Sequence, residues 1–204
     1  MDENTLTDRF LDALRYATVV HRDQRRKGSR VPYVGHLLGV ASLVIDAGGT
    51  EDEAIAALLH DAAEDQGGPR RLEDIRTRFG NRVAGIIEAC SDSLVEDPRA
   101  KAPWLMRKQD YIAHLRANTD KSVYLISASD KLHNAEAMLS DFRVVGDALW
   151  GRFSPDGGRE RILWNFRELI DAYRHGPLDA RRDPIVRRLA DVVDRLDAET
   201  SNAG

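Results

Sequence analysis

Cysteine is nearly absent from this 204-residue sequence, which contains Cys90 alone. One cysteine cannot form an internal disulfide, so we expect the chain to work in a reducing compartment, the cytoplasm. The sequence also lacks the apolar run of roughly 20 residues that a membrane helix requires. Its polar start, MDENTLTDRF, has no apolar signal-peptide core. These absences argue against a disulfide-stabilised secreted fold and predict no membrane partner.

A surplus of positive charge is missing as well. Lysine and arginine number 30 against 34 aspartates and glutamates, a formal net charge of −4, so we expect no nucleic-acid partner. Charge gathers locally, however. Residues 22–30 are mainly basic, and Asp61, Glu64 and Asp65 follow His60 closely. A basic loop and an acidic cluster suit an anionic substrate held beside a metal ion, although two unrelated solvated faces would give the same pattern.

The alternation of period two that marks β-strands is also missing, whereas helical periodicity recurs along the chain. With 42% hydrophobic and 31% charged residues, the composition is that of a globular protein. The fold class is therefore predicted to be all-α, a single-domain bundle of about eight to ten helices over residues 1–204. Helices are expected at about residues 10–17, 35–47, 52–61, 72–79, 82–90, 104–116, 122–139, 158–174 and 185–197.

The helix expected at residues 52–61 is nearly all apolar and should be the central one. Thr50 and Glu53 form a capping-box signature at its start. It ends in His60-Asp61, an unusual pair in such surroundings, because burying both groups unpaired would cost several kcal/mol. Adjacent side chains on a helix point about 100° apart, but at a helix end both can bind the same ion. The pair therefore predicts a metal site.

Further residues extend this constellation. Glu64 and Asp65 fall on the same side as the pair if the helix continues, where a carboxylate can take a proton from an attacking water. Asp130 and Asn134 lie one helical turn apart, and His36 follows the basic loop. Two imidazoles and two carboxylates suit one divalent ion such as Mn²⁺, whereas a structural zinc site would favour thiolates.

From about residue 13 to residue 143 the chain resembles the hydrolase domain of RelA/SpoT proteins, a branch of the HD superfamily. It looks most like the small alarmone hydrolases, which include the metazoan SpoT homologue. Their blocks A-x-x-x-H-x-x-Q-x-R-K, P-Y-x-x-H, L-L-H-D-x-x-E-D, F-G-x-x-V and D-K/R-L-x-N appear here in order, as ATVVHRDQRRK, PYVGH, LLHDAAED, FGNRV and DKLHN. Residues 144–198, expected to form C-terminal helices, follow the resemblance only loosely.

The resemblance implies a helical HD fold and a set of site residues. The Mn²⁺ ligands would be His36, His60, Asp61 and Asp130, and Glu64 with Asp65 would position or activate the water. Arg26 and Lys27 would lie against the nucleotide, and Asn134 would contact its sugar or base. We add Arg107 and Lys108 as candidates for the distal phosphates, although a solvated helix face is the more common explanation of such a pair.

The predicted activity is removal of the 3′-pyrophosphate from a (p)ppGpp-like alarmone nucleotide. An adenosine alarmone, a nicotinamide-nucleotide 2′-phosphate or a nucleoside monophosphate would suit the same metal site, and a catalytically silent nucleotide-binding module is an alternative of another class. The chain departs from the resemblance at Glu136, where arginine is usual, and at Gln66, where threonine is common. We expect Glu136 to point away from the site. The sequence does not indicate an oligomeric state.

Overall fold

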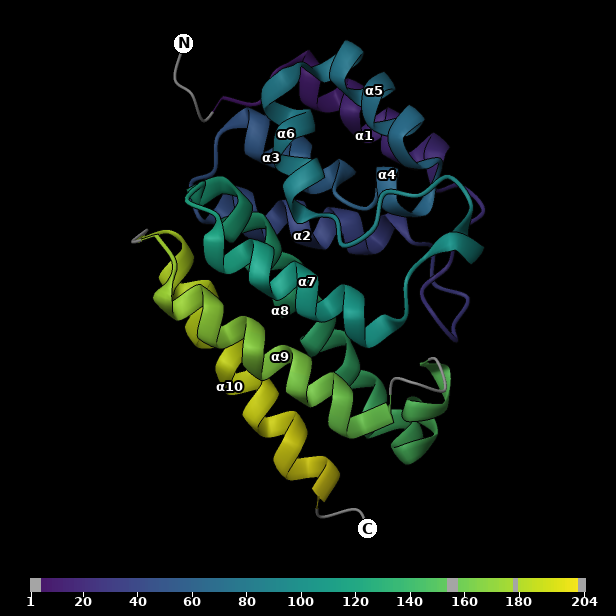
Figure 1. Ribbon diagram of the computed structural model, residues 1–204, viewed down its shortest axis with the longest axis vertical. Helices are drawn as coiled ribbons and strands as arrows, with labels where there is room; N and C mark the ends of the chain where they lie inside the picture. The colour runs from purple at the N-terminus through teal and green to yellow at the C-terminus, as the bar shows by residue number, and fades with distance from the viewer. Residues whose placement is uncertain (1–4, 154–157, 178–179, 202–204) are drawn as a thin grey trace. The chain divides into compact units, whose positions relative to one another are not determined.

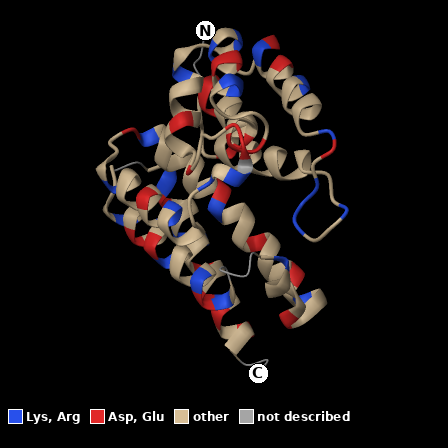
Figure 2. Ribbon diagram, turned by 45° about the vertical axis from the view of Figure 1, so that its right-hand side comes forward, with Lys and Arg blue, Asp and Glu red and all other residues tan. Residues whose placement is uncertain are grey.

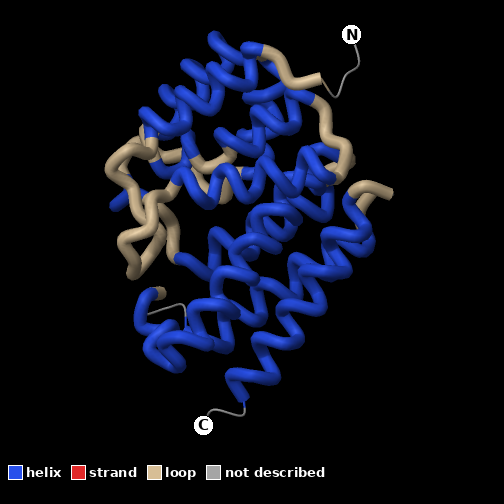
Figure 3. Tube along the Cα trace, turned by 180° about the vertical axis from the view of Figure 1, so that it is seen from behind, coloured by secondary structure: helices blue, strands red, loops and turns tan. Residues whose placement is uncertain are grey.

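The structure, a computed structural model, describes residues 5–153, 158–177 and 180–201. Every regular element within those ranges is helical, and the extended backbone there contributes one isolated bridge between Arg25 and Pro32 (Figure 3). The all-α prediction is confirmed. None of the helices in these ranges is long and apolar enough to cross a membrane.

The chain divides into two compact units, Met1–Pro103 and Trp104–Gly204, with the helices labelled in Figure 1. The expectation of one domain over residues 1–204 stays a prediction. The first unit holds α1 (Asp8–Val20), α2 (Val34–Asp46), α3 (Glu51–Leu59), α4 (Ala62–Asp65), α5 (Gly68–Phe79), α6 (Asn81–Cys90) and the 3₁₀ turn η1 (Pro98–Ala100). The second holds α7 (Trp104–Ala117), α8 (Lys121–Val145), the 3₁₀ turn η2 (Gly146–Arg152), α9 (Gly158–His175) and α10 (Arg182–Ser201).

Helix α3 forms the centre of the first unit, as its apolar sequence predicts. All its residues from Glu53 to Leu59 are buried, and it packs against α1, α2 and α6 (Figure 1). The predicted capping box is present: Thr50 N donates to Glu53 Oε2 at 2.8 Å, and Glu53 N donates to Thr50 Oγ1 at 3.3 Å. Such a cap contributes about 1 kcal/mol and sets where α3 begins.

The ends of two helices in the first unit differ from the sequence-based expectation. Helix α3 stops at Leu59, and the one-turn helix α4 starts only after Asp61. Gly68 and Pro69 begin α5, ahead of the expected start at about residue 72, because proline needs no hydrogen-bond acceptor in a first helical turn. Gly68 has φ +59, and a Cβ there would lie 2.8 Å from the Val95 carbonyl oxygen. Glycine is therefore required at this turn.

Helix α8 is the longest element of the second unit and packs against α9, α10 and η2. Asp120 caps its first turn by accepting from Ser122 N at 3.0 Å. The helix continues past residue 139, the predicted end, because Leu139 and Phe142 keep one face buried, and it ends before Gly146. Helix α10 buries an apolar stripe formed by Ile185, Leu189, Val192, Val193 and Leu196.

Candidate active site

His36 and His60 occupy the ends of two helices in the first unit. His36 lies in the first turn of α2, His60 caps the end of α3, and their exposed fractions are 1% and 5%. The Nδ1 atom of His60 is 2.8 Å from the Ala57 carbonyl oxygen. Because a carbonyl only accepts, Nδ1 carries the proton, and Nε2 presents its lone pair. This is the tautomer that a metal ligand requires, with the backbone fixing the ring.

Asp61 stands at the junction between α3 and α4. Its Oδ2 atom is 3.1 Å from His60 Nε2 and 3.6 Å from His36 Nε2. The same oxygen accepts from the Tyr33 hydroxyl at 2.5 Å. The side chains of Asp61, His60 and His36 therefore face one point beside the junction of the two helices. We did not single out Tyr33 from the sequence, although the P-Y-x-x-H block places it three residues before His36.

Asp130 is buried on α8, in the second unit, with an exposed fraction of 6%. Asn134 Nδ2 donates to its Oδ1 at 2.6 Å, and Lys131 pairs with its Oδ2. Burial alone would lower the pKa of Lys131, but the Asp130 carboxylate outweighs it and holds that pKa well above its usual value. Both oxygens of Asp130 are thus oriented by donors from its own helix.

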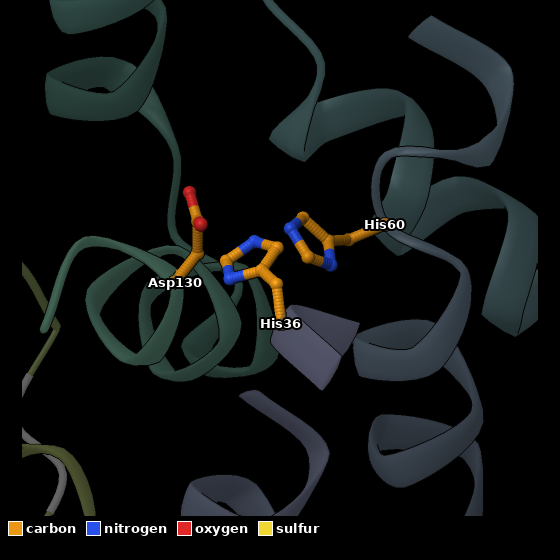
Figure 4. Close-up of side chains that lie close together, drawn as sticks. All are labelled: His36, His60 and Asp130. Atoms are coloured by element: carbon orange, nitrogen blue, oxygen red, sulfur yellow. The ribbon is translucent and has the colours of Figure 1, made fainter. Parts of the chain in front are cut away.

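The ligand atoms of His36, His60 and Asp130 lie within 4.8 Å of one another, and Figure 4 shows the three side chains together. Two imidazoles and a carboxylate are typical ligands of a divalent first-row metal ion. Burying these groups together is costly unless an ion offsets the loss of solvent, so the donor set fits a divalent metal. Asp61 as a further ligand stays a prediction.

Glu64 and Asp65 project from α4. Glu64 Oε1 is 3.1 Å from Lys101 Nζ, and Oε2 accepts from the backbone N–H of Asp92 at 3.2 Å. Burial, with the neighbouring charges of Asp92 and Asp61, raises the pKa of Glu64 to about 7. Burial and the Asp61 charge raise the pKa of Asp65 to about 6. Both acids can therefore exchange protons near neutral pH, as general bases must.

These raised pKa values predict that the metal-free protein loses stability as pH rises from about 4.5 to about 7. In that window the unfolded chain has released the Glu64 proton while the folded protein retains it. The stabilising contribution of the protonated Glu64 carboxyl is thus fully present below about pH 4.5 and is lost as the pH rises through about 7. The Glu64 pKa differs by about 2.5 units between the two states, so at about 1.4 kcal/mol per unit we expect a loss of roughly 3 kcal/mol. Thermal unfolding in chelator checks this, and Glu64→Gln should flatten the pH dependence; an unchanged slope would contradict it.

The predicted nucleotide-binding cations lie on two elements. Arg26 and Lys27 belong to the basic loop between α1 and α2, where Figure 2 shows several cationic positions. The Arg26 guanidinium lies 5.9 Å from the centre of the Tyr33 ring, and Tyr33 in turn contacts the His36 ring edge-on at 5.4 Å. Arg107 and Lys108 are half-buried on α7. Substrate contacts by these four residues and Asn134 stay predictions.

Sequence reasoning also missed Lys101 and Gln24. Lys101 pairs with Glu64, as described above, and Gln24 donates to Asp65 at 2.8 Å. Lys101 lies in the polar connection between α6 and α7, which has no pattern of its own, so nothing in the sequence pointed to it. Gln24 does belong to the ATVVHRDQRRK block, so this motif could have identified it. Only cations of that block were chosen as site residues.

Two buried histidines, a His-Asp pair at a helix junction and a helix-borne aspartate define a helical metal-binding protein. The chain belongs to the HD domain family, since a model of that family matches residues 13–145. The matched stretch contains His36, His60, Asp61 and Asp130.

Several characterised proteins resemble the chain. The guanosine-3′,5′-bis(diphosphate) 3′-pyrophosphohydrolase MESH1 of Xenopus tropicalis is 35% identical over 128 residues, which cover 61% of this chain and 66% of that protein, just under two thirds. Its Drosophila melanogaster counterpart is 29% identical over 185 residues, covering 88% and 94%. A solved structure, described as a metazoan orthologue of SpoT that hydrolyses ppGpp, has a TM-score of 0.70 at 25% identity and covers 94% of this chain and 97% of that one.

Proposed function

We propose that the protein is a metal-dependent phosphohydrolase that removes the 3′-pyrophosphate from (p)ppGpp-like alarmones in the cytoplasm. The observation that carries this proposal is the buried group formed by His36, His60 and Asp130. In the same unit as the two histidines lie Glu64 and Asp65, whose pKa values are raised to about 7 and about 6. The similarity to the MESH1 hydrolases supports the choice of substrate.

In the proposed reaction, water attacks the 3′-linked phosphorus and the bond from that phosphorus to the sugar 3′-oxygen breaks. Pyrophosphate and the 5′-nucleotide leave, and the 3′-oxygen gains a proton. Glu64 with Asp65 takes the proton from the attacking water, since both exchange protons near neutral pH. A divalent ion, which we propose to be Mn²⁺, supplies positive charge for the phosphoryl oxygens. Arg26 and Lys27 bind the nucleotide, Arg107 and Lys108 hold the distal phosphates, and Asn134 contacts the sugar or base.

The test is a side-by-side assay of purified protein, stripped with chelator and reloaded with Mn²⁺, Mg²⁺ or Zn²⁺. The substrates are ppGpp, pppGpp, an adenosine alarmone, a nicotinamide-nucleotide 2′-phosphate and nucleoside monophosphates. We expect guanosine alarmones with Mn²⁺ to give the highest kcat/KM, with pyrophosphate as product. Faster hydrolysis of another nucleotide would identify that nucleotide as the substrate instead. Absence of turnover with every metal would favour a catalytically silent nucleotide-binding module.

Glu136, the main departure from the resemblance, pairs with Arg188 of α10 at 2.7 Å. Its carboxylate is thus directed at α10. Glu136→Arg should change the KM for ppGpp by less than about twofold, because the charge at position 136 interacts with Arg188 rather than with the substrate. Loss of this half-exposed pair, and the repulsion that replaces it, should reduce the free energy of unfolding by about 0.5–1 kcal/mol.

Steady-state kinetics and thermal unfolding at low and high salt check this expectation. The matched control is the double variant Glu136→Arg with Arg188→Glu, which reverses the pair and should recover stability. A tenfold fall in the ppGpp KM in Glu136→Arg would show instead that the Glu136 carboxylate acts on the substrate.

A further inference from the structure

Gln24 has no role in the reaction described so far, yet its side chain reaches one of the two acids. Its Nε2 atom donates to Asp65 Oδ2 at 2.8 Å. We propose that Gln24 is a positioning residue that holds the Asp65 carboxylate in place for proton transfer from the attacking water. This inference rests on the proposed function and deepens it.

The orientation of the Gln24 amide is determined by two donors on its other side. Its Oε1 atom lies 2.6 Å from His21 Nδ1 and 2.7 Å from Gln66 Nε2. Burial lowers the pKa of His21, which keeps its ring neutral. Its Nε2 atom is buried with no hydrogen-bond partner among the described residues, so the single proton belongs on Nδ1, which donates it. A flipped amide would place an N–H₂ group against both donors. The Gln24 N–H₂ group must therefore face Asp65.

Gln66 is itself anchored by the helix that follows. Arg71 Nε, on α5, donates to the Gln66 carbonyl at 2.9 Å, and Arg71 Nη1 donates to the Tyr16 hydroxyl at 3.0 Å. Gln66 stands where the resemblance favours threonine, whose shorter side chain carries no amide. The backbone of Gln24 is held as well, because its carbonyl accepts from Tyr33 N at 3.1 Å. Gln24 is thus fixed by α1, α5 and the end of the basic loop.

This hydrogen bond has two consequences for Asp65. It occupies Oδ2 and leaves Oδ1 to accept the proton from water. It also favours the ionised carboxylate, as Lys101 and His60 do, against burial and the Asp61 charge, which raise the Asp65 pKa. Without Gln24, Asp65 would rotate more freely and hold its proton more tightly. Both changes slow proton transfer without altering how the nucleotide binds.

Gln24→Leu should therefore lower kcat roughly 10- to 100-fold, the equivalent of one hydrogen bond to a charged group. KM and Mn²⁺ affinity should stay within about twofold of wild type. Gln109→Leu, the same substitution at an exposed position of α7, is the matched control and should leave kcat unchanged. A parallel loss of kcat in the control, or a change confined to KM, would overturn the assignment.

A double-mutant cycle separates positioning from a structural role. If Gln24 acts through Asp65, adding Gln24→Leu to Asp65→Asn should change kcat by less than about twofold, whereas adding it to Glu64→Gln should have its full effect. A structural defect would instead lower kcat by the same factor in all backgrounds. Additivity with Asp65→Asn would overturn the proposal.

An NMR titration of the Asp65 carboxyl carbon gives a readout without turnover. In the metal-free protein the Asp65 pKa should rise above its wild-type value in Gln24→Leu. It should rise further in Gln24→Glu, which keeps the shape of the side chain and replaces the donor with an acceptor. An Asp65 pKa that is the same in all three proteins would overturn the proposal. Failure of wild type to hydrolyse any nucleotide would instead refute the proposed function, while this titration still decides the role of Gln24.

Discussion

His60→Ala and Asp61→Ala are each expected to abolish metal binding and turnover, the largest effect foreseen for this protein. His60 Nε2 and His36 Nε2 lie 3.1 and 3.6 Å from Asp61 Oδ2, so the three groups converge on one point. Removing one ligand from such a small set leaves too few donors to hold an ion against water. Loss of a ligand typically exceeds the 10- to 100-fold cost of losing an outer partner, so we expect more than about 100-fold weaker affinity.

The measurements are metal content after desalting, titration calorimetry with Mn²⁺, and hydrolysis under saturating metal. His114→Ala, which removes an exposed imidazole from α7, is the matched control and should retain both metal and activity. Circular dichroism verifies that His60→Ala, at the buried end of α3, still folds. Full metal occupancy in the His60→Ala/Asp61→Ala double variant would refute the metal site.

Glu64→Gln is expected to keep the metal and lose on the order of 10²–10⁴-fold in kcat, the usual scale of general acid–base catalysis. The amide keeps the size of the side chain and its contact with Asp92 N, but it cannot take a proton from water. Glu64 is outside the group of His36, His60 and Asp130, so metal affinity should change little. Because the raised pKa of Glu64 is about 7, wild-type kcat should increase as the pH rises towards neutrality. The variant should lack this rising limb of the pH profile.

Single-turnover rates and Mn²⁺ titrations of both proteins check this result across the pH range. Glu73→Gln removes a carboxylate whose side chain is 70% exposed on α5, and it should leave the rate unchanged. A bound divalent ion shifts the rising limb to lower pH, because its charge favours the ionised carboxylate. Near wild-type activity in Glu64→Gln would show that Glu64 only pairs with Lys101.

The amino-acid sequence was sufficient to predict the helical class and most of its elements. A nearly continuous apolar segment located the buried α3. Helical periodicity located α10, because a helix buries residues at a spacing that is visible in one dimension. The capping box at Thr50 is equally local, since both of its hydrogen bonds join residues three positions apart. The three residues of the candidate metal site were predicted by joining five short motifs, each of which is weak when taken alone.

Only the tertiary structure decided how those residues act together. Helix α3 ends before His60 and α4 begins after Asp61, whereas the sequence predicted one helix over residues 52–61. The pairing of Glu64 with Lys101, and of Asp65 with Gln24, joins residues 37 and 41 positions apart. The raised pKa values arise from burial among neighbours distant in sequence. These contacts and pKa shifts depend on distance and solvent exclusion in three dimensions, so no local pattern in the sequence reveals them.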